Sequence, residues 1–167
     1  RYREQGTVGN LSAFNRLAIL PTRNFQHSQL DGAEDLASAL EQGTRASDRT
    51  ACASCTIGCE HHYRFSGQSV RLEYESLFAL GPLCGVADAE DIVSAAQRCD
   101  EWGIDTVSAG ATVAFAMECA ERGLIDAKTA PRFGDASSLL QALDNIAHRR
   151  GLGDQLAQGT RRMAHAI

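Results

Sequence analysis

Apolar side chains recur with helical spacing along most of the chain. The clearest pattern begins at Asp88 and is closed by Gly103, with apolar positions at Ile92, Val93, Ala96 and Cys99. Similar patterns predict further helices over residues 7–17, 31–43, 110–123, 135–151 and about 154–165. Thr7, Asp31 and Asp135 are the expected N-terminal caps of three of them. The fold class that follows is all-α and multihelical.

One stretch departs from this pattern. Residues 63–73 alternate roughly between apolar and polar side chains around Ser66-Gly67-Gln68, which predicts one small β-hairpin. Strands and helices do not alternate as a parallel sheet requires. No internal repeat or linker divides the sequence, so residues 1–167 are expected to form a single helical domain.

Composition and charge narrow the class of protein. The net charge of -5 argues against nucleic acid or an anionic membrane as the main partner, because both need clustered Lys and Arg. No apolar run approaches the ~20 residues of a membrane span. The polar start at Arg1, without an initiator Met or signal peptide, indicates a piece of a longer protein.

Cysteine usage is the unusual feature, because three of the six cysteines fall within eight residues. The spacing Cys52-x-x-Cys55-x-x-x-Cys59 brings three thiolates onto one short arc of backbone, as an iron–sulfur cluster requires. Zinc bound by these thiolates together with His61 or His62 is one alternative. Disulfides or inert buried thiols are another. The metal interpretation predicts a reducing, cytoplasmic compartment.

The fourth thiolate of such a cluster is not obvious. Cys84 is one candidate, at the end of a long gap after Cys59. Cys99 and Cys119 instead occupy positions where the helical pattern places core residues. The sequence therefore leaves the fourth ligand either at Cys84 or outside the chain.

Two acidic segments go beyond patterning. Glu73-Tyr74-Glu75 stands beside an apolar run, so that one carboxylate could lie in a desolvated cleft with a raised pKa; a solvated strand end is the competing interpretation. In the second segment, residues 100–105, one helix closes at Gly103, and Asp105 could cap the next. Asp100 could accept hydrogen bonds from an amine-bearing heterocycle; a capped helix–helix corner is the competing interpretation.

Five patches in order resemble the aldehyde:ferredoxin oxidoreductase family of tungstopterin enzymes. They are Gly6-Thr7 with residues 20–25, the cysteine segment 51–59, Glu73-Tyr74-Glu75 with Leu80-Gly81, residues 103–110, and residues 151–159. The resemblance implies that Cys52, Cys55 and Cys59 ligate a [4Fe–4S] cluster. It implies that Asp100, Gly103, Ile104 and Asp105 contact a pterin, and that Glu75 lies near the tungsten or molybdenum as a catalytic acid or base. Members oxidise aldehydes to carboxylic acids and pass the electrons to ferredoxin.

The resemblance also sets the expected extent of the protein. The chain is similar to the helical middle domain, so the N-terminal pterin-cradling β domain and the C-terminal domain, with its Asp-x-x-Gly-Leu-Cys motif, would be partners on the same polypeptide. Alone, the chain is expected to be inactive and to lose its cofactors. A ring-reducing benzoyl-CoA reductase subunit shares these motifs, and a helical binding module with a structural Cys3His zinc site is a different class of alternative.

Overall fold

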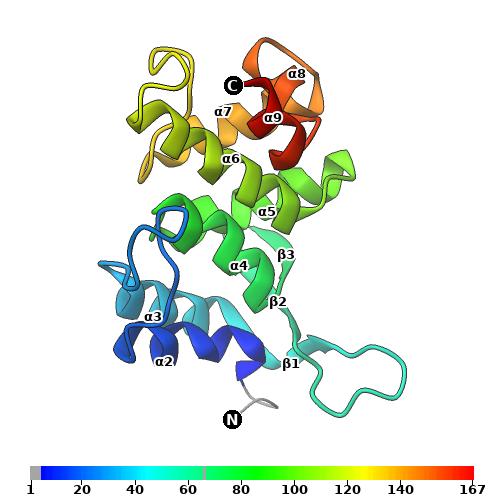
Figure 1. Cartoon of the computed structure of the whole chain (residues 1–167). Coiled ribbons are helices and arrows are strands. Elements are labelled where there is room, and N and C mark those ends of the chain that lie inside the picture. The colour runs from blue at the N-terminus through cyan, green and yellow to red at the C-terminus, as the bar shows by residue number, and fades with distance from the viewer. Residues whose placement is uncertain (1–4, 66) are drawn as a thin grey trace.

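The structure is a computed structural model that describes residues 5–65 and 67–167. Helices predominate, and one small antiparallel sheet interrupts them (Figure 1). The elements, in chain order, are η1 (Thr7–Gly9), α2 (Asn10–Arg16), α3 (Ala33–Gly43), β1 (Thr44–Thr50), β2 (Glu60–Phe65), β3 (Gln68–Leu72), α4 (Tyr74–Leu80), η2 (Pro82–Cys84), α5 (Ala89–Trp102), α6 (Thr106–Glu121), α7 (Ala136–Ala147), α8 (Leu152–Leu156) and α9 (Thr160–Ala166). The expected all-α class with a small hairpin is confirmed.

The hairpin is the part of the sheet that the sequence predicted. Strands β2 and β3 pair antiparallel, with Tyr63 opposite Val70, and both of these side chains are buried. β1 adds a third strand on the other side of β2, with an irregular register. The sequence of β1 is almost wholly polar, so it lacks the alternation of apolar and polar residues that predicts a strand.

Helix α4 lies at the centre of the molecule. Helices α2 and α3 lie on one side of it, whereas α5 and α6 lie on the other and carry α7, α8 and α9 beyond them (Figure 1). The approach of α6 to α4 is very close: a Cβ on Gly110 would lie 2.4 Å from the Ala79 carbonyl oxygen. Only glycine fits at this position, so this residue sets the spacing of the two helices.

Three expected boundaries were wrong. Thr7 does not cap its own helix: its hydroxyl oxygen accepts a hydrogen bond from the Tyr74 N–H at the start of α4. The helix expected from Gly110 begins earlier, at Thr106. The single helix expected over 154–165 is two short ones, because Gly159 adopts a φ of 86° between them. The expected cap at Asp135 does accept the Ser138 N–H. Asp88, which was not predicted as a cap, accepts the Asp91 N–H at the start of α5.

Candidate functional site

The three clustered cysteines lie on the loop between β1 and β2. This loop projects from the body of the molecule at the end of the sheet (Figure 1). Cys52 and Cys55 are exposed, and Cys59 is partly buried where the chain re-enters the sheet. The backbone N–H of Cys55 donates a hydrogen bond to the Cys52 carbonyl oxygen at 3.0 Å, which forms a tight turn between the first two cysteines.

Backbone groups of the loop favour a thiolate at Cys55. The N–H groups of Gly58 and Ile57 point at its sulfur and lower the pKa of this thiol. At Cys59 the pKa is raised, first by burial and then by the negative charge of Glu73. N–H donors that face a cysteine sulfur are what an iron–sulfur cluster uses to tune its potential, so the donor chemistry of the loop fits a cluster.

The geometry of the thiols is open rather than gathered. Among the residues that the structure describes, no three His, Cys, Asp or Glu side chains are arranged to hold a metal ion. All six cysteines are free thiols, which contradicts the disulfide alternative. The loop thus supplies the ligand types for a metal centre without itself fixing their positions.

Cys84 lies in quite different surroundings. Its side chain is fully buried, and its thiol donates weakly to the carbonyl oxygens of Ala79 and Gly110, at 3.4 and 3.6 Å. Burial raises the pKa of this thiol to about 12, so the thiolate needed by a metal is strongly disfavoured. The structure therefore argues against Cys84 as the fourth cluster ligand.

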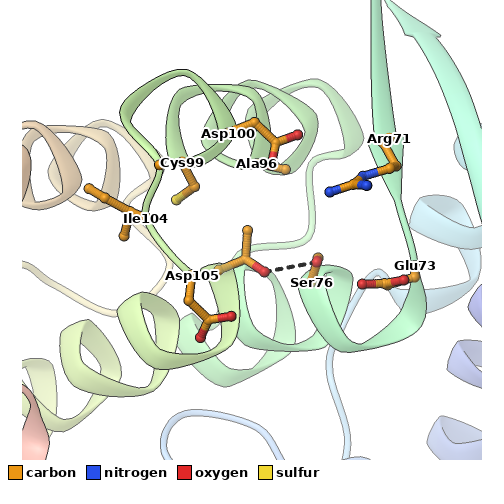
Figure 2. Close-up of a pocket in the computed structure, with 10 residues that line it drawn as sticks. Arg71, Glu73, Ser76, Ala96, Cys99, Asp100, Ile104 and Asp105 are labelled. Atoms are coloured by element: carbon orange, nitrogen blue, oxygen red, sulfur yellow. Dashed lines mark hydrogen bonds between the residues drawn. The ribbon is translucent and has the colours of Figure 1, made fainter.

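A second candidate site is a pocket of about 300 Å³ between β3, α4 and the α5–α6 corner (Figure 2). Its walls are largely polar and come from segments some thirty residues apart in the chain. The lining residues are Arg71, Glu73, Ser76, Ala96, Cys99, Asp100, Gly103, Ile104, Asp105 and Thr106. All four residues expected to contact a cofactor, at positions 100, 103, 104 and 105, lie in this wall.

The α5–α6 corner is held by its own hydrogen bonds. Gly103 adopts a φ of 65°, which ends α5 in a left-handed turn, and the Ile104 N–H donates to the Cys99 carbonyl at 2.8 Å. Asp105 then caps α6, since its carboxylate accepts the Ser108 N–H at 2.7 Å. Hydrogen bonds from the Ser108 hydroxyl and then from its N–H lower the pKa of Asp105, and the carboxylate stays ionised near neutral pH.

The two acids of the Glu73-Tyr74-Glu75 segment have different environments. Glu73 is half-buried and lines the pocket, and its pKa is raised by burial and by the neighbouring charges of Glu75 and Glu60. Glu73 is therefore the desolvated carboxylate that the sequence predicted in this segment. Glu75, the expected catalytic residue, is exposed on the first turn of α4 and does not line the pocket.

Glu73 also connects the pocket with the cysteine loop. It lines the first, and its negative charge contributes to the raised pKa of Cys59 in the second. Because such an interaction falls off with distance, the two candidate sites are neighbours. A cofactor in the pocket and a metal centre on the loop would lie on either side of one carboxylate.

Comparison with known proteins decides what these two sites belong to. The sequence profile described as "Aldehyde ferredoxin oxidoreductase, domains 2 & 3" matches residues 1–167, which is the entire chain. The chain belongs to the aldehyde ferredoxin oxidoreductase family. This confirms the resemblance that the five sequence patches indicated.

Two curated relatives in the family are tungsten-containing aldehyde ferredoxin oxidoreductases. The one from Thermococcus kodakarensis is 35% identical over 95% of this chain and 27% of its own length. The one from Pyrococcus furiosus is 34% identical over 96% of this chain and 28% of its own length. The chain thus spans little more than a quarter of the curated relatives it matches.

A solved structure shares the fold. The active site complex BamBC of benzoyl coenzyme A reductase in complex with 1,5-dienoyl-CoA superimposes with a TM-score of 0.62 and 25% identity. The match covers 80% of this chain and 21% of that chain. The helical scaffold of this chain is therefore also found in a benzoyl coenzyme A reductase complex that holds 1,5-dienoyl-CoA.

Three pocket residues were not among the site residues predicted from the sequence. Arg71 is a single cation within a short strand, and Ser76 and Thr106 are common polar residues whose hydroxyls meet at 2.9 Å (Figure 2). No spacing rule identifies such residues, because β3 and the corner are brought together only by the tertiary fold. As for membranes, no helix among the described residues is both long and apolar enough to span one.

Proposed function

We propose that this chain is the helical part of a tungsten- or molybdenum-pterin, iron–sulfur oxidoreductase that oxidises aldehydes to carboxylic acids and delivers the electrons to ferredoxin. In that protein, residues 1–167 would form the middle domain of a longer polypeptide. The observation that carries the proposal is the adjacency of two sites of different chemistry. Glu73 lines the polar pocket, and its charge also acts on Cys59 of the thiol loop, so a metal centre on the loop and a redox cofactor in the pocket would be neighbours.

The residues of the loop would hold the cluster. Cys52, Cys55 and Cys59 would supply three thiolates, and the Ile57 and Gly58 N–H groups would stabilise negative charge on the Cys55 sulfur. The fourth ligand would come from outside the described residues, because Cys84 is buried among backbone carbonyls. Cys59, which is partly buried, would be the ligand on the side of the loop nearest Glu73 and the pocket.

The residues of the corner would hold the pterin. Asp100 would accept hydrogen bonds from its amine groups, whereas Gly103 and Ile104 would let the backbone approach it closely. Asp105 would keep the start of α6 in place through its cap. When bound, the tungsten-pterin would supply the two-electron oxidation, and the cluster would relay the electrons singly.

Glu75 would then serve as proton acceptor. Oxidation of an aldehyde to a carboxylic acid releases protons, and a carboxylate on the exposed first turn of α4 could take one of them. Its neighbour Glu73 differs in that burial raises the pKa of its carboxyl group. The two acids would therefore divide their roles, with Glu75 on the substrate side and Glu73 on the cofactor side.

Activity assays of the full-length protein, purified without oxygen, test the proposal. We expect oxidation of aldehydes with reduction of ferredoxin or of a viologen dye. The alternative favoured by the structural match is reduction of an aromatic thioester. Turnover of benzoyl-CoA without any oxidation of aldehydes would favour that alternative and reject ours. A protein containing zinc alone would reject both, since a structural zinc site carries no electrons.

A further inference from the structure

Three charged side chains face one another across the pocket without pairing. Figure 2 shows Arg71 extending from β3 toward Asp100 on α5, while Glu73 points into the same space from the start of α4. Among the described residues, no ion pair joins Arg71 to either carboxylate; its guanidinium instead contacts Glu60 at 3.4 Å.

Arg71 has hydrogen-bonding capacity beyond its contact with Glu60. That contact uses Nη1 alone and is long. An arginine carries several N–H donors in one plane, and Figure 2 shows the guanidinium of Arg71 directed into the pocket. The fixed planar fork suits a carbonyl oxygen of a planar ring.

The charges specify what kind of ligand would fit. The pocket is lined by one guanidinium and by the three carboxylates of Glu73, Asp100 and Asp105, and this excess of negative charge disfavours a phosphate or another anion. Asp105 caps α6 with its carboxylate, which leaves those of Glu73 and Asp100. Two carboxylates accept hydrogen bonds, and the guanidinium donates them. The matching ligand edge has adjacent N–H donors beside a carbonyl acceptor. Ala96 and Ile104 offer apolar surface for the faces of a flat ring.

We infer that Arg71 and Glu73, together with Asp100, recognise the pyrimidine edge of the pterin. That edge carries an exocyclic amine, a ring N–H and a carbonyl, which is the donor–donor–acceptor pattern the pocket complements. The carbonyl accepts from Arg71, and the two nitrogens donate to the carboxylates. This inference rests on the proposed function, and it adds binding residues that neither the motif spacing nor the relatives' names identify.

The experiment measures how firmly the full-length protein retains its pterin. Wild type, Arg71→Gln, Arg71→Lys and Glu73→Gln are purified without oxygen. Pterin is quantified by fluorescence after extraction and oxidation, and its rate of release is followed in mild urea. Arg98→Gln is the matched control, because Arg98 is exposed on the same helix as Asp100 but does not line the pocket. Iron and acid-labile sulfide are measured in every sample.

We expect pterin to leave Arg71→Gln about tenfold faster than wild type, as for loss of one charge-assisted hydrogen bond. Arg71→Lys keeps the charge but lacks the planar fork and should fall between the two. Glu73→Gln should also release pterin faster, because its amide N–H groups oppose those of the ring. Iron, sulfide and the Arg98→Gln control should be unchanged.

Release rates equal to wild type in both Arg71 variants would overturn the inference while leaving the proposed function intact. If Arg71→Gln fails to fold, which loss of its iron and sulfide would reveal, Arg71→Lys decides the matter by the same comparison. Wild-type protein that contains iron and sulfide but no pterin would overturn the proposed function, and the inference with it.

Discussion

The cysteine loop and the α5–α6 corner both carry a distinctive motif, but they differ in how far contacts within the chain fix their geometry. The loop projects from the sheet with Cys52 and Cys55 exposed, and its three thiols are not gathered around one point. The corner is fixed by a left-handed glycine, by the bond from Ile104 to Cys99, and by the cap at Asp105. One site is built by the protein alone, whereas the other depends on what it binds.

This difference indicates how the two sites respond to change. A preorganised corner owes its geometry to helix caps and close packing, so damage to it should appear as lost stability. Cys52 and Cys55 are exposed, so their substitution should leave stability nearly unchanged and remove the metal centre. The predictions that follow separate these two responses.

The largest effect is expected in the loop. Cys55→Ser in the full-length protein should reduce bound iron and acid-labile sulfide to near zero, because a hydroxyl does not replace a thiolate in a cluster. Iron analysis and the visible absorbance of the purified protein measure this. Cys84→Ala is the matched control, since that thiol bonds to backbone carbonyls, and its iron content per folded chain should equal that of wild type. Iron loss in Cys84→Ala would make Cys84 a ligand after all.

The next effect concerns the packing that supports the corner. Gly110→Ala would place a Cβ at 2.4 Å from the Ala79 carbonyl oxygen, and α4 and α6 must move apart. We expect unfolding to become easier by about 1–3 kcal/mol, as for other overpacked sites. Urea denaturation followed by circular dichroism tests this. Gly123→Ala adds the same methyl group in open space, where only the strain of its φ of 70° should cost stability, about 1 kcal/mol. A loss at Gly110 no larger than the loss at Gly123 would refute the packing argument.

A smaller effect is expected at the cap itself. Asp105→Ala removes the acceptor for the Ser108 N–H and should cost about 1 kcal/mol of unfolding free energy. Asp105→Asn retains an oxygen acceptor and should lose less. The same denaturation assay distinguishes them. If Asp105→Ala were as stable as wild type, the corner would not depend on its cap.

The smallest effect is the pH dependence of that cap. The bond to Ser108 lowers the pKa of Asp105 below its ordinary value of 3.8, so its contribution is complete above that pH and is lost as the pH falls through the folded pKa. Acidification below 3.8 should therefore destabilise wild type more than Asp105→Asn, which does not titrate there. Parallel pH profiles of the two proteins would contradict this.

Sequence reasoning succeeded where the signal is local. The helix from Asp88 to Gly103 carries its own apolar period and closing glycine, and the structure reproduces both. The pterin-contact candidates at positions 100–105 fall in one pocket wall for the same reason. Local spacing also placed the three cysteines on one loop.

It failed where distant segments decide the outcome. Thr7 has the residue type of a cap, but the fold turns its hydroxyl toward Tyr74, far along the chain. Arg71 enters the pocket only because β3 ends beside α5. The contrast between Glu73 and Glu75 likewise depends on which residue precedes α4 and which faces outward from its first turn. Such relations are tertiary, and no spacing in the sequence encodes them.

Metal analysis of the full-length protein, purified without oxygen, tests the central claim most directly. The account predicts iron and acid-labile sulfide in equal amounts, together with tungsten or molybdenum and extractable pterin. Substitution of Cys52, Cys55 or Cys59 should remove the iron and sulfide. Zinc bound without sulfide would contradict the account, because the loop would then be a structural metal site and not a relay for electrons.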